Sequence, residues 1–268
     1  LHPRVRRQRQ MCIRDRAEVR EYLCGTIEEL ADPYLMKGMR EAVSLLREKI
    51  REGASIRIIG DYDIDGVNAT HILITALRRC GAQADTVIPD RMKDGYGINE
   101  HLIGDAKKAG VDTIITCDNG IAAAKEIAFA KELGMTVIVT DHHDILYQEE
   151  ADGGRTVILP PADVIVNPKQ PDCRYPFKKL CGAAVAWRLA EALYREEGVP
   201  REEFLDLAEF AAVATVGDIM DLTGENRILV KYGLKRLEQT KNPGYRALLA
   251  VNGLEGKKLT AYHIGFVI

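Results

Sequence analysis

The feature that most limits the possible folds is a regular alternation of short apolar runs with helical patterns. Five runs rich in isoleucine and valine have the length of buried strands, at 55–60, 84–89, 113–117, 136–140 and 163–167. Strands that alternate with helices predict an α/β fold, in which a mostly parallel sheet has helices on both faces. The residues expected in its core are Ile56, Ile58, Ile59, Ile114, Ile115, Val137, Ile138 and Val139.

Helices are expected before, between and after these strands. The predicted ranges are 17–30, 34–52, 67–79, 99–109, 121–133, 180–196, 201–216, 225–240 and 243–251. The stretch 144–162 is rich in Asp, Gly and Pro and is predicted to be a loop. The first sixteen residues carry six arginines without apolar periodicity. We expect a disordered or non-native tail there, and a basic arm that binds nucleic acid is the alternative.

The composition argues against a protein that binds nucleic acid by bulk charge. The net charge is −3, with 29% charged and 46% hydrophobic residues, which is ordinary for a globular protein. A nucleic-acid substrate would therefore need metal ions and a local basic groove. The six cysteines form no C-x-x-C pair, so we expect reduced thiols in a cytoplasmic protein. No apolar run is long enough to span a membrane.

Three aspartates follow the first apolar run at alternate positions: Asp61, Asp63 and Asp65, with Gly66 after them. Carboxylates gathered at the end of a buried strand repel one another and are costly to desolvate. A divalent cation such as magnesium or manganese offsets that cost best. The alternative is a surface turn in which one aspartate caps the next helix.

Two further polar clusters follow later strands. Asp118 lies in Cys-Asp-Asn-Gly after the third apolar run, where a cap and turn is an equally available interpretation. His142 and His143 lie between Asp141 and Asp144 after the fourth run. Imidazole is a common metal ligand, and a neighbouring aspartate can fix its tautomer, although plain capping is the alternative here. Carboxylates mixed with imidazole favour manganese or magnesium over tetrahedral zinc.

These clusters, taken together, resemble a known family. GDYDIDG (60–66), CDNG (117–120) and TDHHD (140–144) are similar, in order and in position after strands, to the successive motifs of the DHH phosphoesterase superfamily. PDRMKDGYG (89–97) and LTGENRILVKYGLKRL (222–237) resemble its RecJ exonuclease branch, as does the stretch 165–187. The resemblance runs from about Asp32 to the last residue.

The resemblance implies a role for each motif residue. The ligands of two manganese or magnesium ions would be Asp63, Asp65, Asp118, His142 and Asp218, with Asp118 as the bridge. The groups that face the substrate phosphate or support the ligands would be Asp61, Asp141 and His143. Arg91 would hold a substrate phosphate, and a surface ion pair is its alternative. By itself, Asp218 would be interpreted as the end of a helix.

The resemblance also implies a division of the chain and a function. The parts would be a tail (1–16), N-terminal helices (17–53), a DHH catalytic domain (54–220) and a helical end (221–268) that leads to a missing second domain. The expected activity is metal-dependent 5′–3′ exonuclease cleavage of single-stranded DNA in repair and recombination. The expected partners are single-stranded DNA and a repair helicase or single-strand-binding protein, in the cytoplasm and not at a membrane.

Three other functions stay open from the sequence. A DHH-type phosphodiesterase acting on short oligonucleotides or cyclic dinucleotides would use the same metal site. A metal-dependent binding module would hold the ions without turnover. A dinucleotide-binding domain would need a G-x-G-x-x-G loop after the first strand, and the loop there is acidic instead.

Overall fold

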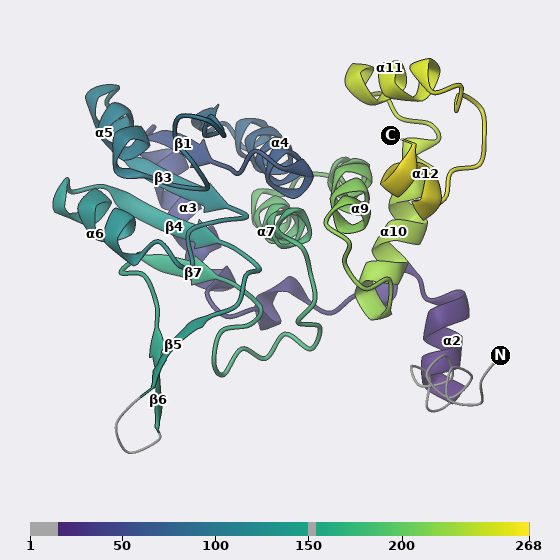
Figure 1. Cartoon of the computed structure of the whole chain (residues 1–268), viewed down its shortest axis with the longest axis horizontal. Coiled ribbons are helices and arrows are strands. Elements are labelled where there is room, and N and C mark those ends of the chain that lie inside the picture. The colour runs from purple at the N-terminus through teal and green to yellow at the C-terminus, as the bar shows by residue number, and fades with distance from the viewer. Residues whose placement is uncertain (1–15, 150–153, 268) are drawn as a thin grey trace.

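The apolar runs form one parallel sheet (Figure 1). The computed structural model describes residues 16–149 and 154–267. In that part the strands follow the order β2-β1-β3-β4-β7 and pair in parallel. Their bounds are β1 Ser55–Ile59, β2 Gln83–Val87, β3 Thr113–Cys117, β4 Thr136–Thr140 and β7 Val164–Val166. Parallel pairing places the carboxyl ends of all these strands at the same edge of the sheet.

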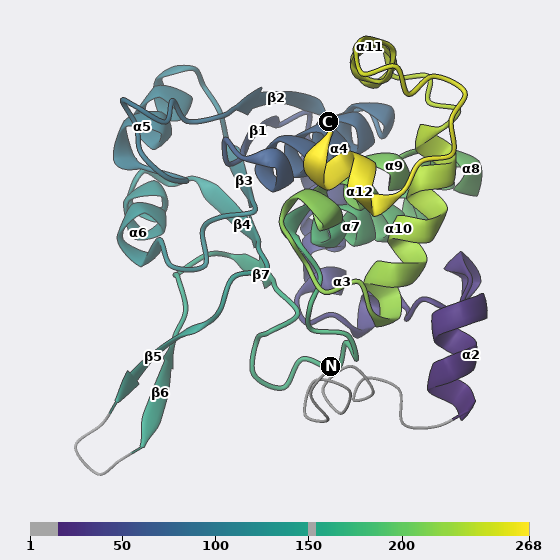
Figure 2. The same cartoon turned by 45° about the vertical axis from the view of Figure 1, so that its right-hand side comes forward.

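Helices cover both faces of the sheet, which confirms the predicted α/β fold (Figures 1 and 2). One face packs against α5 (Glu100–Lys108) and α6 (Ala124–Glu132). The other packs against α3 (Met39–Arg51), α4 (Ile64–Arg79) and α7 (Gly182–Glu197). All eight residues predicted for the core are fully buried, and they divide between the two apolar clusters because successive strand residues point to opposite faces.

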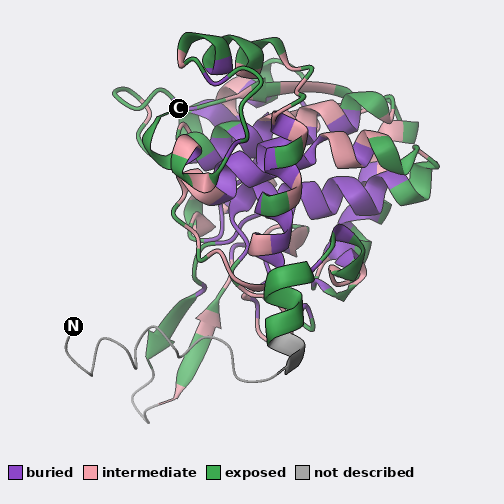
Figure 3. Ribbon diagram, turned by 90° about the vertical axis from the view of Figure 1, so that its right-hand side faces the viewer, coloured by how far each residue is buried: buried purple, intermediate pink, exposed green. Residues whose placement is uncertain are grey.

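The last third of the chain is helical. The helices after α7 are α8 (Arg201–Asp206), α9 (Ala208–Gly217), α10 (Gly224–Leu237), α11 (Pro243–Val251) and α12 (Ala261–Phe266). One face of α9 contributes to the core beside α4 and α7, and the other packs with α10, α11 and α12 in a separate apolar cluster. Figure 3 shows burial concentrated in the central helices, while α11 and the hairpin of residues 146–158 are largely exposed where they are described. No helix in the described part of the chain is long and apolar enough to cross a membrane.

Several predicted boundaries are wrong, each for a local reason. The expected loop 144–162 contains an antiparallel hairpin, β5 (Leu146–Glu149) and β6 (Arg155–Ile158). Its strands are short and mostly exposed, so they lack the apolar alternation that marks a buried strand. The expected helix 201–216 divides into α8 and α9 at Leu207.

The N-terminal predictions need a similar correction. In place of the helix expected over 17–30, the structure has a shorter helix, α2 (Arg16–Cys24), followed by a 3₁₀ turn (Ile27–Glu29). The helix expected over 34–52 begins only at Met39, after a second 3₁₀ turn (Pro33–Leu35). The predicted tail, except for its last residue, lies outside the described residues.

Candidate metal centre

The candidate site lies at the point where the strand order reverses. The first strand, β1, lies between β2 and β3, so the chain moves from β1 outward to β2 and then crosses back over β1 to form β3 on its other side. In open parallel sheets, the crevice beyond the carboxyl ends of the strands at such a reversal is where ligands bind. Asp61 follows β1 and Asp118 follows β3, so the two aspartates flank this crevice, and His142 comes from the adjacent strand β4.

The three aspartates after β1 have different environments. Asp63 is the N-cap of α4, where its Oδ1 accepts hydrogen bonds from the backbone N–H groups of Asp65 and Gly66, both at 2.9 Å. The capping interpretation is therefore correct for this one aspartate, and the cap starts α4 three residues before the predicted helix. Asp61 is 0% exposed, and neither of its carboxylate oxygens accepts a hydrogen bond of good geometry, although the backbone N–H groups of Tyr62 and Gly97 lie close enough to lower its pKa in part. Burial raises its pKa.

Asp65 is held from the opposite side by the first turn of α7. Its Oδ2 accepts the N–H of Gly182 at 2.6 Å, and its Oδ1 accepts the N–H of Ala183 at 2.7 Å. These are donors that the helix itself leaves unpaired, and the positive end of the helix dipole favours a carboxylate there. Burial nevertheless raises the pKa of Asp65, so the helix does not fully compensate for the lost water.

Asp118 is the most constrained residue of the site. Its φ of 61° lies in the left-handed region, which aspartate enters more readily than most residues but still at a cost of about 1–3 kcal/mol. A Cβ on Gly182 would approach the Asp118 side chain to 2.6 Å, so α7 can pack here only because that residue is glycine. Burial first, and then the charges of Asp65 and Asp63, raise the pKa of Asp118 to about 12.

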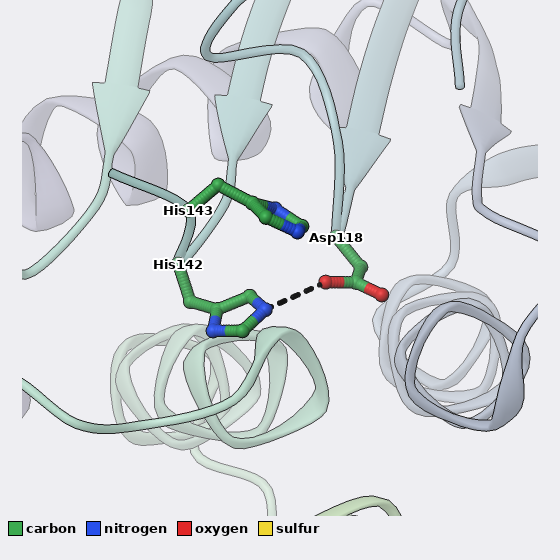
Figure 4. A group of neighbouring side chains, drawn as sticks. All are labelled: Asp118, His142 and His143. Atoms are coloured by element: carbon green, nitrogen blue, oxygen red, sulfur yellow. Dashed lines mark ion pairs between the residues drawn. The ribbon is translucent and has the colours of Figure 1, made fainter. Parts of the chain in front are cut away.

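His142 lies among three of the predicted ligands. Its Nε2 is 3.1 Å from Asp118 Oδ1 (Figure 4). The same atom is 3.6 Å from Asp65 Oδ2 and 3.8 Å from Asp218 Oδ2. Burial lowers the pKa of His142, which favours the neutral imidazole that binds metals. The fourth residue, Asp218, is the C-cap of α9 and comes from the helical part of the chain. Burial, followed by the charges of Asp65 and Asp63, raises its pKa to about 6.

A hydrogen-bonded chain supports His143. The buried Asp141 accepts four donors: the backbone N–H groups of His142, His143 and Ile121, and His143 Nδ1 at 2.7 Å. Burial alone would raise the pKa of Asp141, but the hydrogen bond and charge of His143 outweigh it and lower the pKa. The same hydrogen bond raises the pKa of His143. On the other side of the ring, Nε2 lies 3.2 Å from the hydroxyl of Tyr96.

The described residues offer three overlapping groups of candidate metal ligands. Within each group the ligand atoms lie within 4.8 Å of one another. The groups are Asp61, Asp63 and Asp118; Asp65, His142 and Asp218; and Asp118, His142 and His143. Asp118 and His142 each belong to two of the groups, and of these two residues only Asp118 has a carboxylate, whose two oxygens can bind two ions at once. Asp61, predicted as a supporting residue, lies among these candidate ligands.

The donor set fits divalent cations. Both oxygens of Asp61 and Oδ1 of Asp118 are buried acceptors without a hydrogen bond of good geometry, even though His142 Nε2 lies near the latter, and they come from a cluster of like charges. Such a cluster is costly unless protons or cations neutralise it. Carboxylate oxygens with one or two imidazoles match manganese or magnesium better than a tetrahedral zinc site.

Arg91, predicted to hold a substrate phosphate, is exposed and lies beside the aspartates that follow β1. Its guanidinium lies over the ring of Tyr62, 5.1 Å from the centroid, next to the aspartates after β1. Within residues 16–149 and 154–267 it forms no ion pair, so the surface ion pair considered above is not seen. Tyr62 in turn packs edge-on against Tyr96, with the centroids 6.3 Å apart.

Sequence reasoning missed two residues of the site. Tyr96 donates to the backbone carbonyl of Asp118 at 3.1 Å and contacts His143, although 22 and 47 residues separate them. Gly182 contacts both Asp65 and Asp118 from a helix more than sixty residues away in the chain. Both positions lie in stretches that resemble the RecJ branch, but the pattern alone does not show what they contact.

Comparison with known proteins agrees with this geometry. Residues 55–215 match the family described as "DHH family, N-terminal domain". The chain is 43% identical over 235 residues to the single-stranded-DNA-specific exonuclease RecJ of Bacillus subtilis, covering 88% of this chain and 28% of the relative. It is 35% identical over 244 residues to the RecJ of Escherichia coli, covering 87% and 41%. The chain thus spans less than half the length of these relatives.

Solved structures show the same similarity. The crystal structure of exonuclease RecJ bound to manganese matches with a TM-score of 0.73 at 37% identity, over 86% of this chain and 55% of that one. The structure of RecJ in complex with Mn²⁺ from Thermus thermophilus matches with a TM-score of 0.70 at 32% identity, over 95% and 38%.

Proposed function

Because this chain belongs to the DHH family, we propose that it is the catalytic part of a RecJ-type nuclease. The proposed activity is metal-dependent hydrolysis of phosphodiester bonds in single-stranded DNA, from the 5′ end, in DNA repair and recombination. The observation that carries it is the set of overlapping ligand groups that share Asp118 and His142 at the reversal of strand order.

We propose that two Mn²⁺ or Mg²⁺ ions are held by Asp63, Asp65, Asp118, His142 and Asp218, and that Asp61 completes the group around Asp118. Such a pair of ions supplies Lewis-acid stabilisation of the phosphate and an activated water. The chain needs no nucleophilic serine or cysteine for this chemistry, and the buried Cys117 and Cys181 fit that role poorly because burial raises the pKa of each thiol.

The remaining residues act on the substrate and on the proton. Arg91 binds a phosphate through its guanidinium fork, which Tyr62 orients by stacking. His143 is the proton donor or charge stabiliser, and Asp141 holds its ring so that Nε2 points away from the buried carboxylate. This division of roles matches the directions of the pKa shifts, since His142 favours the neutral form and His143 the charged form.

The decisive experiment is cleavage of end-labelled DNA by this chain beside a full-length relative. Single- and double-stranded 20-mers, labelled at either end, are incubated with Mn²⁺, with Mg²⁺ and with a chelator. We expect manganese-dependent shortening of the single strand from its 5′ end and no cleavage with chelator. Cleavage that persists with chelator would contradict the proposal. Cleavage confined to dinucleotides or cyclic dinucleotides would favour the alternative phosphodiesterase.

We place the protein in the cytoplasm, since its described cysteines are free thiols and two of them are buried among apolar residues. The proposal includes a helicase or a single-strand-binding protein as partner, because a nuclease specific for single strands needs its substrate unwound. A test is whether adding a helicase lets the protein degrade a duplex that it otherwise leaves intact.

A further inference from the structure

A cavity of about 300 Å³ opens beside His143 on the α5/α6 side of the site. It lies between the loop before α5 and the turn that leads into α6. The residues that line it are Tyr96, Gly97, Ile98, Asn119, Gly120, Ile121, Ala122, Ala123, Glu126, Asp141, His143 and Asp144. His143 is a candidate metal ligand and Asp141 holds its ring, and both residues also line this cavity. The cavity therefore begins next to the place where the scissile phosphate would bind.

The walls of the cavity are fixed by hydrogen bonds. Asn119 accepts the N–H of Ile98 at 3.2 Å and donates to the carbonyls of Ile59 and Cys117, which ties the loop before α5 to the strand ends. Asp141 accepts the N–H of Ile121 at 2.9 Å and fixes the opposite wall. A site whose walls are held in this way is formed before a ligand arrives.

The lining shows which part of a nucleic acid fits. Apolar atoms make up the larger share of the lining, to which Ile98 and Ile121 contribute although they are mostly buried, and the half-exposed Tyr96 lies at the rim. Besides His143, the charged side chains that line the cavity are the carboxylates of Glu126, Asp141 and Asp144, and no lysine or arginine among residues 16–149 and 154–267 joins them. A phosphate would be repelled there, whereas a neutral planar base stacks on aromatic and apolar surfaces.

Arg91 gives the direction of the bound strand. Its guanidinium stacks on Tyr62, and Tyr62 packs against Tyr96 at the rim of the cavity. A nucleotide at this place would have one phosphate near Arg91, its next phosphate at the metal centre and its base beneath Tyr96. We propose that this cavity binds the base of the terminal nucleotide, the one that is released. This inference rests on the proposed nuclease function and deepens it.

The first test of this proposal removes the base of one nucleotide in the DNA substrate and leaves the protein unchanged. Three 5′-phosphorylated 12-mers are compared: an unmodified strand, one with a tetrahydrofuran abasic nucleotide at the 5′ end, and one with the same abasic nucleotide at position six. For each, anisotropy measures binding with Ca²⁺, and the first cleavage is timed with Mn²⁺. We expect the terminal abasic nucleotide to weaken binding and slow the first cleavage roughly tenfold. The internal one should change neither.

A pair of variants tests the location. Ala122 lines the cavity and is exposed, so Ala122→Phe should obstruct it without disturbing the core. We expect this variant to lose the advantage of the terminal base, so that it treats unmodified and abasic 5′ ends alike. Lys125→Phe adds the same ring to an exposed position of α6 that does not line the cavity, and it should keep the wild-type advantage.

The outcomes separate the two proposals. Equal binding and cleavage of unmodified and terminally abasic strands by the wild type would overturn the cavity proposal and leave the nuclease intact. An unchanged preference in Ala122→Phe would also overturn it. No cleavage of any strand by the wild type would instead contradict the proposed function.

Discussion

At the scale of single residues, the site is a set of carboxylates that the fold forces together. Asp118 shows this most clearly, because its backbone is left-handed, its side chain is buried and its Oδ1 has no hydrogen bond. The aspartates were predictable since each follows an apolar strand and parallel strands end at one edge. Tyr96 was not, because its contacts depend on how the loop before α5 folds back over the sheet.

Replacing Asp118 by asparagine should separate function from stability. We expect Asp118→Asn to abolish manganese-dependent cleavage, and also to raise the melting temperature of the metal-free protein, because it removes a desolvated charge from a cluster of like charges. Cleavage assays and thermal melts with chelator measure the two effects. The half-buried Asp112, paired with Lys49 at the other end of the sheet, is the control, and Asp112→Asn should leave cleavage unchanged. Full activity in Asp118→Asn would refute the metal assignment.

Asp218 gives a prediction with a definite sign. Its pKa rises from 3.8 to about 6 on folding, so the folded protein holds this proton more tightly than the unfolded chain. The protonated Asp218 therefore contributes to the stability of the folded protein, and this contribution is fully present below about pH 4 and is lost as the pH rises through 6. Metal-free Asp218→Asn should therefore melt at a higher temperature than the wild type near pH 7.5, and the difference should vanish near pH 4. A difference independent of pH would show that Asp218 titrates normally.

At the scale of secondary-structure elements, α7 supports the site. Its first turn donates two N–H groups to Asp65, and its Gly182 makes room for Asp118. Strand and helix order were predictable from periodicity, since the five apolar runs each became a strand of the sheet. The hairpin β5–β6 was not, because a pair of exposed strands is stabilised by its own hydrogen bonds and not by burial.

Gly182→Ala tests the contact between α7 and the site. Its Cβ would lie 2.6 Å from the Asp118 side chain, so the variant must displace either the helix or the ligand. We expect a loss of about 1–3 kcal/mol in the free energy of unfolding and much weaker Mn²⁺ binding, measured by urea melts and titration calorimetry. Gly104→Ala in α5 meets no atom within 4 Å and should stabilise the protein by about 0.5–1 kcal/mol. Equal Mn²⁺ affinity in both variants would contradict the packing argument.

At the scale of the whole molecule, the candidate ligands join two parts of the chain. Most of them come from the strand ends of the sheet, and Asp218 comes from α9 in the helical part. With a net charge of −3, the chain has no general attraction for a polyanion, so binding to DNA would depend on the metal centre and on local groups such as Arg91.

Removing the metal should therefore affect the entire fold. We expect Mn²⁺ at about one hundred times its dissociation constant to stabilise the protein by about 2.7 kcal/mol, seen as a higher melting temperature than with chelator. In Asp118→Asn, the same Mn²⁺ concentration should produce little or no shift. A shift of equal size in that variant would mean that the ion binds elsewhere.

Asp141 connects the cavity with the candidate metal centre. Its one carboxylate fixes Ile121 in the wall of the cavity and His143 beside the candidate ligands. A base bound on one side and a cation bound on the other would then share a common support. If the bound base raises the affinity for the cation through this support, thermodynamic reciprocity requires that the cation raise the affinity for the base by the same factor. An enzyme arranged in this way would hold its ions most tightly while it is working, and release them most readily when its substrate is exhausted.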